Sequence, residues 1–289
     1  MSTEPSARRE HPSTYFVQDR SNEVERERVT LQDQMFTQRM GGVLPEQPDP
    51  TIFSRVLDVG CGTGGWLIEA AKTYPAMTTL VGADISIRMV EYARKLAQEQ
   101  GVSDRVEFHV MDALRMIEFP QSYFDLVNQR MSWAYMRTWD WSNLLQKYRR
   151  VAKSGGVIRI SETAASGETN SPALNQLSTI ACDAFFNAGH LFERRADGLT
   201  SKLADLLHQQ GFQNVQTRKV MMEPEIGSAA EAASKENLRL LFRTMLPFLQ
   251  KWTQVPKDYD QIYQQALDDM NKSDYRGQWE MVTVWGTNP

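Results

Sequence analysis

The feature that most constrains this chain is the stretch VLDVGCGTGGW at residues 56–66, where an apolar run breaks into glycines. Such a run predicts a buried strand that turns into a helix, and the glycines let the backbone of the turn approach a ligand closely. The glycines fit two patterns: the dinucleotide-binding spacing G-x-G-x-x-G starts at Gly60, and D-x-G-x-G-x-G starts at Asp58. Glycine spacing alone therefore leaves the ligand open.

The pattern of strand, turn and helix repeats further along the chain. Apolar runs predict strands at residues 55–59, 78–85, 105–111, 124–129 and 156–162. Helical stretches separate most of them, at residues 66–74, 88–100 and 141–152. Strands that alternate with helices favour right-handed crossovers and a mostly parallel sheet with helices on both faces. We therefore expect an α/β fold.

The rest of the chain is predicted to be mainly helical. We expect an N-terminal helix from Ser21 to Met40, ended by Gly41 and Gly42 and followed by a proline-marked linker. Further helices are expected at residues 173–188 and 199–210 and as a pair within 228–271, with strands at 215–222 and 279–285. The apolar surface of the N-terminal helix is broad, so it packs either on its own domain, which we favour, or on another subunit.

We divide the chain after residue 50. Residues 1–50 are expected to form a helical extension or lid, and residues 51–289 the main domain, with helical cap segments at about 163–210 and 223–278. The second cap segment contains LRLLFRTMLPFLQKW, which is rich in Leu, Phe and Met. Such a segment either roofs a pocket for a bulky hydrophobic ligand or forms a dimer surface.

Composition excludes several classes of protein. The net charge is −4 and no run of Lys and Arg exceeds a pair, so the basic footprint of a nucleic-acid-binding protein is missing. The polar N-terminal residues lack the apolar core of a signal peptide, and nowhere do about eighteen apolar residues follow one another, so we expect no membrane insertion. The two cysteines, Cys61 and Cys182, form no disulfide framework or zinc-binding spacing. We expect a cytoplasmic protein without a metal.

Three acids lie where the first three strands are predicted to end. Asp58 disfavours a phosphate in the turn, but its carboxylate can accept hydrogen bonds from an ammonium group, directly or through water. Asp84 lies where a carboxylate takes both hydroxyls of a ribose, and Asp112 can accept from the exocyclic amine of an adenine. Each acid alone could simply cap the next helix, which for Asp112 alone we favour. Together, at the edge where open α/β sheets bind ligands, they indicate a site for a cationic ligand with a ribose, a feature that nicotinamide and adenosyl ligands share.

The motifs also carry a family resemblance. VLDVGCGTGGW, LVGADIS, VEFHVMDAL, FDLVNQR and KSGGVIRISE together resemble the class I S-adenosylmethionine-dependent methyltransferases, over roughly residues 50–162. The resemblance implies a Rossmann-like, seven-stranded, mostly parallel sheet in the order 3-2-1-4-5-7-6, with the last strand antiparallel and helices on both faces. The fourth strand ends in NQRM rather than in the Asn/Asp-Pro-Pro-Tyr of enzymes that methylate adenine or glutamine amides. A small molecule, as in the branch that modifies secondary metabolites, is therefore the expected acceptor.

The resemblance also implies S-adenosylmethionine as the cofactor and assigns residues to its parts. Beside the methionine portion and in the glycine turn lie Asp58, Gly60, Cys61, Gly62 and Gly64. Asp84 would hold the ribose, and around the adenine would lie Ile85, Met89, Asp112 and Ala113. At the end of the fourth strand, beside the sulfonium, would lie Asn128, Gln129 and Arg130.

The acceptor side is predicted from aromatic and ionisable residues. Candidates for contact with the acceptor are Tyr15, Phe16, Arg130, Trp133, Tyr135 and His190. Tyr15 and Phe16 would close over the cofactor as a lid, whereas the aromatics after Arg130 could instead pack the next helix on the sheet. A hydroxyl or amine acceptor needs a general base, for which His190 and Glu162 are the candidates, although a lone His among apolar residues is more often structural. An alkene acceptor would instead form a carbocation, which aromatic faces stabilise.

The predicted function is S-adenosylmethionine-dependent C-, O- or N-methylation of a small, hydrophobic metabolite, one possibility being C-methylation of a prenyl or terpenoid compound. An NAD-dependent oxidoreductase is an alternative, but it leaves Asp58 and Asp112 unexplained, and no Tyr-x-x-x-Lys pair follows. A non-catalytic protein that binds an adenosyl ligand is the other alternative. The expected partner is the small acceptor, and a second copy of the chain, bound through the N-terminal helix, is a further possibility.

Overall fold

The molecule is built around an eight-stranded sheet. The structure is a computed structural model, which describes residues 23–223 and 227–289. Tyr15 and Phe16 therefore lie outside the described residues. The strands are β1 (Arg55–Val59), β2 (Thr79–Asp84), β3 (Val106–Val110), β4 (Phe124–Arg130), β5 (Ala152–Thr163), β6 (Glu168–Thr169), β7 (Gln213–Met222) and β8 (Gly277–Thr287). Their order is β3-β2-β1-β4-β5-β8-β6, and β7 also pairs with β8.

This order confirms the expected topology, because the predicted sixth and seventh strands are β7 and β8. β1 to β5 pair in parallel, whereas β8 runs antiparallel to both β5 and β7. The short β6, which pairs with the start of β8, is an additional strand that the sequence pattern did not predict. Two residues are too few to produce an alternating pattern.

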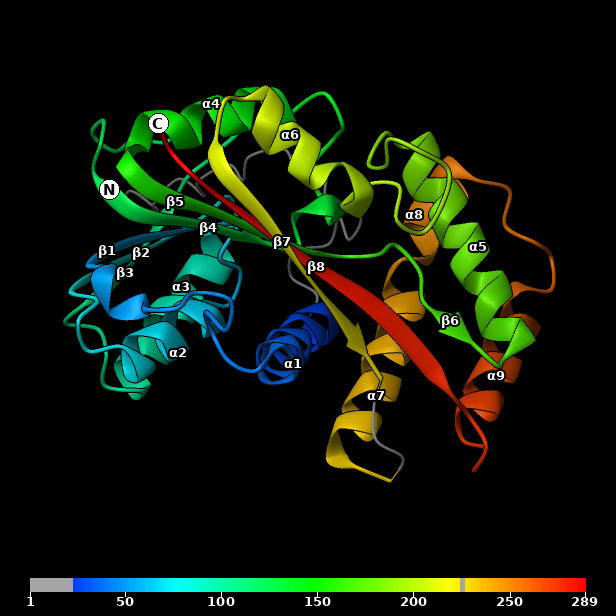
Figure 1. Cartoon of the computed structure of the whole chain (residues 1–289). Coiled ribbons are helices and arrows are strands. Elements are labelled where there is room, and N and C mark those ends of the chain that lie inside the picture. The colour runs from blue at the N-terminus through cyan, green and yellow to red at the C-terminus, as the bar shows by residue number, and fades with distance from the viewer. Residues whose placement is uncertain (1–22, 224–226) are drawn as a thin grey trace, which may run out of the picture.

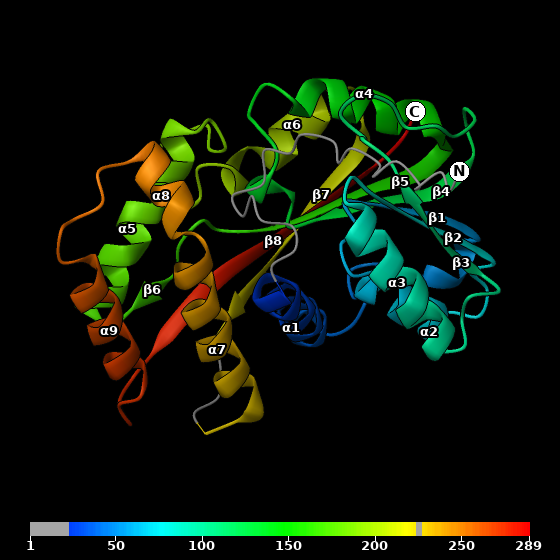
Figure 2. The same ribbon diagram turned by 180° about the vertical axis from the view of Figure 1, so that it is seen from behind.

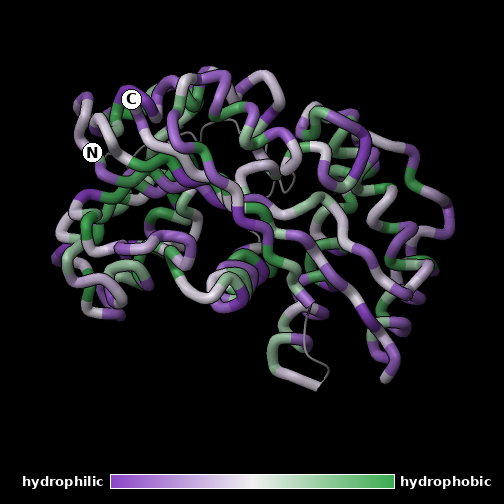
Figure 3. Tube along the Cα trace, in the orientation of Figure 1, coloured by the Kyte–Doolittle hydropathy of each residue, from purple (hydrophilic) through white to green (hydrophobic). Residues whose placement is uncertain are grey.

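Helices cover both faces of the sheet. On one face lie α2 (Gly65–Thr73) and α3 (Ile87–Glu99), and on the other lie α4 (Trp141–Val151) and α6 (Leu203–Gln209) (Figures 1 and 2). Val56 and Leu57 of β1 are fully buried, as expected for a parallel strand covered on both faces. The chain is mostly hydrophobic along the central strands and mostly hydrophilic in the outer turns (Figure 3).

A second group of helices lies to the side of this sheet (Figure 1). It contains α5 (Pro172–Asn187), α8 (Leu246–Trp252) and α9 (Tyr259–Met270), and α7 (Ala229–Thr244) connects it to the region below the sheet. We call α5 and α7–α9 the cap. β8 continues from the sheet into the cap, where β6 pairs with its first residues (Figure 1).

The segment after β7 contains three helices rather than the expected pair within residues 228–271. Pro247 is the reason, because it lies in the first turn of α8 and has no N–H to continue the hydrogen bonding of α7. The expected helix at 199–210 also divides, into a short 3-10 turn at Thr200–Lys202 and α6. α6 packs on β7 and β8 beside α4, away from the cap (Figure 1).

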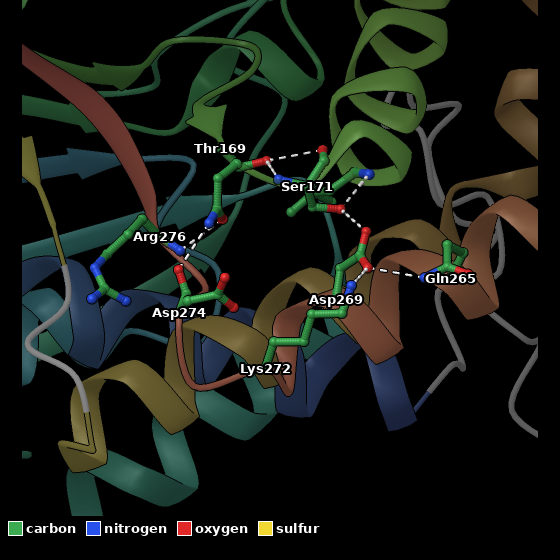
Figure 4. A network of polar contacts seen from close by, with 9 residues as sticks. Thr169, Ser171, Gln265, Asp269, Lys272, Asp274 and Arg276 are labelled. Carbon is green, nitrogen blue, oxygen red and sulfur yellow. Dashed lines mark hydrogen bonds and ion pairs between the residues drawn. The ribbon is translucent and has the colours of Figure 1, made fainter.

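A polar cluster holds the cap together (Figure 4). Ser171 caps α5 by accepting from the Leu174 N–H at 3.1 Å, and its hydroxyl donates to Asp269 of α9 at 2.7 Å. Asp269 also accepts from Lys272 at 2.6 Å and Gln265 at 2.9 Å. The hydrogen bonds from Lys272, Ser171 and Gln265 lower the pKa of Asp269 to about 2.

The N-terminal helix α1 (Glu23–Met40) packs within its own chain, along α7 and against α2. Its buried Met35, Phe36 and Met40 form a small core with Met222 and Met281. The helix ends where the sequence predicts, because Gly41 and Gly42 adopt positive φ angles of 91° and 121°. Within the described part of the chain, no helix is both long enough and apolar enough to cross a membrane.

Candidate functional site

A cavity of about 340 Å³ lies between the carboxyl ends of the strands and a roof made by α1 and α7. Its floor includes the predicted residues Asp58, Gly60, Cys61, Gly62, Asp84, Ile85, Met89, Asp112 and Ala113. Its roof and far wall include Val29, Met35, Phe36, Phe185, Met222, Leu238, Leu241, Phe242, Met245 and Trp279. The cavity is thus acidic on the side of the glycine turn and largely apolar on the side of the cap.

The glycines of the turn have different physical roles. Gly60, Gly62 and Gly64 adopt φ angles of 71°, 53° and 77°, which favour glycine. A Cβ on Gly60 would collide with the hydroxyl of Tyr135, so the phenol lies directly on the turn. A Cβ on Gly64 would lie 2.6 Å from Phe108, and Gly64 is not among the cavity-lining residues. Gly64 therefore allows helix and sheet to pack closely.

Asp58 is buried at the end of β1 and is 4% exposed. Its Oδ1 accepts a hydrogen bond from Asn128 Nδ2 at 2.8 Å. Burial raises the pKa of Asp58 to about 7, although the hydrogen bond from Asn128 and the charge of Arg130 oppose this rise. A carboxylate held in this way favours a cation, because the ligand's charge offsets the cost of burial.

Backbone amides fix the other two acids. Asp84 accepts from the N–H of Gly62 at 3.0 Å and of Ser86 at 2.8 Å, so it links the glycine turn to the start of α3. Asp112 accepts from the Leu114 N–H at 3.0 Å, which is the loop-capping role considered for it from the sequence. Asp112 nevertheless lines the cavity, so the capping role and a ligand contact are compatible.

The residues that end β4 divide between the cavity and the core. Asn128 and Gln129 are fully buried and are not among the lining residues, and Gln129 accepts from the Tyr148 hydroxyl at 2.7 Å. Arg130 does line the cavity, where it forms an ion pair with Asp33 of α1 and donates to Thr37 at 2.9 Å. Burial raises the pKa of Asp33, against the charge of Arg130.

Neither candidate for a general base lines the cavity. Glu162 is fully buried and accepts from the backbone N–H of Ser132 at 2.9 Å and from the Ser132 hydroxyl, so it holds the turn after β4. Burial raises the pKa of Glu162 to about 7. His190 is fully buried between Phe185 and Phe248, with its Nδ1 2.7 Å from the Met136 carbonyl oxygen. Burial lowers the pKa of His190 to about 4.

The two aromatic residues predicted to contact the acceptor, Trp133 and Tyr135, both line the cavity. Trp133 packs edge-on against Phe185, with ring centroids 4.4 Å apart. Burial raises the pKa of Tyr135 well above its ordinary value, which keeps the phenol protonated. Trp139, from the same aromatic stretch, is 69% exposed and is not among the lining residues.

Sequence reasoning missed Arg28 and Asp33 of α1, which both line the cavity. Arg28 is 2% exposed and donates to Asn237 of α7 at 3.2 Å, across the contact between the two roof helices. Sequence reasoning also missed the buried ion pair of Arg159 and Glu46, whose Nε and Oε1 atoms are 2.7 Å apart. The available signal was Arg159 itself, a charge inside the apolar strand pattern GVIRISE.

The fold and the acids at the strand ends define a Rossmann-like domain with a ligand cavity at the carboxyl edge of its sheet. In comparison with known proteins, residues 56–156 match the family described as "Methyltransferase domain". These residues are therefore similar to the methyltransferase domain of class I, S-adenosylmethionine-dependent methyltransferases.

Individual relatives agree with this assignment. The chain is 36% identical over 119 residues to aklanonic acid methyltransferase DauC of Streptomyces sp. (strain C5), a match that covers 41% of this chain and 52% of that protein. It is 30% identical over 129 residues to geranyl diphosphate 2-C-methyltransferase of Saccharopolyspora erythraea, covering 44% and 40%. The matches thus span about half or less of these relatives.

A solved structure supports the fold. Phosphoethanolamine N-methyltransferase 2 of Haemonchus contortus, in complex with phosphomonomethylethanolamine and S-adenosylhomocysteine, superposes with a TM-score of 0.51 at 19% identity. The match covers 87% of this chain and 52% of that one. At this identity the likeness establishes the architecture of the chain.

Proposed function

We propose that this protein transfers the methyl group of S-adenosylmethionine to a small, largely apolar organic metabolite. The observation that carries the proposal is the two-sided cavity, in which Asp58, Asp84 and Asp112 face a largely apolar roof and far wall. Relatives named for methylating small molecules, among them aklanonic acid and geranyl diphosphate methyltransferases, support the reaction class.

The cofactor supplies an electrophilic methyl group on a positively charged sulfur. Asp58 is suited to the ammonium group of its methionine portion, since a buried carboxylate gains most from a nearby cation. Asp84, held by two backbone amides, presents a fixed carboxylate to the ribose hydroxyls. Ile85 and Met89 supply apolar contacts for the adenine, with Asp112 at its edge.

The acceptor side favours chemistry that depends little on a protein base. Among the described residues that line the cavity there is no His and no Glu, and the phenol of Tyr135 is held protonated by its raised pKa. Methyl transfer can proceed mainly through close and aligned placement of the two reactants. Asp33, the acid that α1 adds to the lining, is paired with Arg130, so an acceptor that needs no protein base fits best: a carbon nucleophile or a group that is itself acidic. The aromatic wall suits a prenyl or terpenoid carbon that develops positive charge.

The first test is native mass spectrometry of the purified protein with S-adenosylmethionine, S-adenosylhomocysteine or NAD. We expect an added mass for both adenosyl ligands and none for NAD, and methyl transfer when apolar acceptors are then supplied. Binding of NAD alone would favour the oxidoreductase instead. Binding of the adenosyl ligands without turnover on any acceptor would favour the non-catalytic alternative.

Other features also belong to this proposal. We infer that residues 1–50 act as a lid and that residues 51–289 form the catalytic unit. Limited proteolysis with and without S-adenosylhomocysteine tests the lid, because a closed lid is cleaved more slowly. A cytoplasmic location and a homo-oligomer through α1 remain predictions, and sedimentation velocity tests the oligomer.

A further inference from the structure

Three side chains behind the cavity lie side by side on adjacent strands. Asp58 of β1 is the register partner of Asn128 of β4, and Asn128 is the register partner of Arg159 of β5. Partners in register point to the same face of a sheet, so neighbouring side chains can touch. Here they form a continuous chain: Arg159 donates to Asn128 at 2.8 Å, and Asn128 donates to Asp58 at 2.8 Å.

The far end of this chain is anchored by Glu46. Arg159 donates to the carboxylate of Glu46 through Nε at 2.7 Å and through Nη2 at 3.3 Å. The side chains of Arg159 and Glu46 are 0% and 1% exposed. Arg159 also lies beside the Trp66 ring, 5.9 Å from its centroid. Glu46 belongs to the linker between α1 and β1, so the chain connects the roof helix to the cofactor side of the cavity.

The order of donors and acceptors in this chain permits one orientation of the Asn128 amide. A guanidinium has only donors and a carboxylate only acceptors, so the amide must turn its oxygen to Arg159 and its NH₂ to Asp58. If Arg159 were absent, the amide could rotate, and Asp58 would lose both its donor and a nearby positive charge. Arg159 therefore acts on Asp58 without touching it.

We propose that Arg159, held by Glu46, is a positioning residue of the cofactor site that keeps Asp58 oriented and negatively charged for the ammonium group of S-adenosylmethionine. This inference rests on the proposed function, because it assigns that ammonium group to Asp58. The proposal gives a role to the buried ion pair of Arg159 and Glu46, because placing a charge in an apolar strand costs free energy.

The charges around Asp58 give the expected direction of each change. Burial raises the pKa of Asp58 to about 7, Arg130 and Arg159 lower it, and Asp33 raises it. Losing the charge of Arg159 would raise this pKa further. Because the ammonium group binds the ionised carboxylate, binding would then begin to weaken at a higher pH as the pH is lowered. Losing the charge of Glu46 would leave Arg159 uncompensated, so the pKa of Asp58 would fall.

The experiment is a titration of S-adenosylhomocysteine affinity by calorimetry from about pH 5.5 to about pH 9. The proteins are the wild type, Arg159→Met, Arg159→Lys and Glu46→Gln, with Arg105→Met as the matched control. Arg105 is an arginine of the sheet region that is less buried than Arg159, and its guanidinium donates to the backbone carbonyls of Met77 and Ala71.

We expect Arg159→Met to weaken binding roughly tenfold near neutral pH and to move the midpoint of its pH dependence up by about one unit. Glu46→Gln should move the midpoint down, Arg159→Lys should restore most of the wild-type midpoint, and Arg105→Met should leave it unchanged. Opposite shifts from the two partners of one ion pair are not expected of residues that only support folding. Should Arg159→Met fail to fold, Glu46→Gln and Arg159→Lys still decide the question.

The same midpoint is measured without ligand by following the Asp58 carboxyl carbon by NMR. If folded Arg159→Met or Glu46→Gln keeps the wild-type midpoint, or if these two variants shift it in the same direction, the role of Arg159 is overturned. Failure of the wild type to bind S-adenosylhomocysteine at any pH would overturn the proposed function, and with it the ligand assigned here. These two failures are therefore distinguishable.

Discussion

The nucleotide-binding half and the cap are held in place by contacts of different range. On the cavity floor, Asp84 accepts from Ser86, two residues away, and Asp112 from Leu114, also two residues away. In the cap and roof, Ser171 and Asp269 are 98 residues apart, and Arg28 and Asn237 are 209 residues apart. Two of the three floor acids thus find a partner within their own short motif, although Asp58 is held by Asn128, 70 residues away, whereas the roof depends on how distant helices meet.

Asp84→Ala tests the floor and has the largest expected effect. The variant removes the carboxylate assigned to both ribose hydroxyls, and hydrogen bonds to a charged group contribute about 1.5 to 3 kcal/mol each. We expect S-adenosylhomocysteine affinity to fall by roughly a hundredfold or more, measured by calorimetry. Asp104→Ala, at a side chain that is 73% exposed, is the control. Unchanged affinity in Asp84→Ala would remove Asp84 from the cofactor site.

The ion pair of Asp33 and Arg130 tests the junction between roof and floor. Removing one partner leaves the other buried and unpaired, so Asp33→Asn or Arg130→Met should cost about 3 kcal/mol of unfolding free energy. The double variant should cost less than the sum of the two, which urea unfolding of all four proteins measures. Additive costs would mean that the pair does not join α1 to the sheet. Hydrogen exchange should also become faster in α1 of the single variants.

Asp58→Asn tests whether the floor is strained for the sake of its ligand. The pKa of Asp58 is raised from about 3.9 in the unfolded chain to about 7 in the folded protein. Between these two pH values the folded protein binds one proton more than the unfolded chain, so its stability falls as the pH rises. We expect the ligand-free variant to be more stable than the wild type by about 2 kcal/mol near pH 8 and equally stable near pH 4. Thermal unfolding at both pH values measures this, and the variant should bind S-adenosylhomocysteine less tightly.

A stability difference for Asp58→Asn that is the same at both pH values would contradict this account. Gln129→Glu is not a suitable control, because it would add a second buried acid. Asp104→Asn, which changes an exposed acid, is suitable and should leave both curves unchanged.

Asp269→Asn tests the cap and has the smallest expected effect. Its pKa is lowered to about 2, so its contribution is present above the unfolded value near ~3.9 and is lost as the pH falls from about 4 to about 2. We expect a loss of about 1 kcal/mol near neutral pH and no effect on S-adenosylhomocysteine affinity. Urea unfolding near neutral pH and at about pH 2, where the contribution of Asp269 is lost, checks the expected loss of stability. A change in affinity would mean that the cap is coupled to the floor.

Local sequence predicts the floor because each element there has a signal of its own. The glycines require positive φ angles, and each acid follows an apolar strand, so Asp58, Asp84 and Asp112 could be placed at one edge before any packing was known. The strand order came from the family resemblance rather than from these signals. β6, with two residues, gave no pattern at all.

Roles that depend on packing could not be predicted in the same way. Gly64 fits the glycine pattern of a ligand turn, but the position of Phe108 decides what it contacts. Glu162 and His190 are suitable residue types for a base, yet one holds the turn at Ser132 and the other lies between aromatic rings. Arg159 was visible as an unusual charge, whereas its partner Glu46, 113 residues away, was not.

The position of β8 between β5 and β7 has a consequence for the order in which a ribosome delivers this chain. β7 ends at Met222 and pairs with β8, which begins at Gly277, so α7, α8 and α9 must all be synthesised before β7 can pair. Until then both β5 and β7 present unpaired N–H and C=O groups along an edge, which is a template for aggregation. The sequence of β7, QNVQTRKVMM, contains an arginine, a lysine and two glutamines. Such polar residues reduce the tendency of an unpaired strand to aggregate before β8 is synthesised.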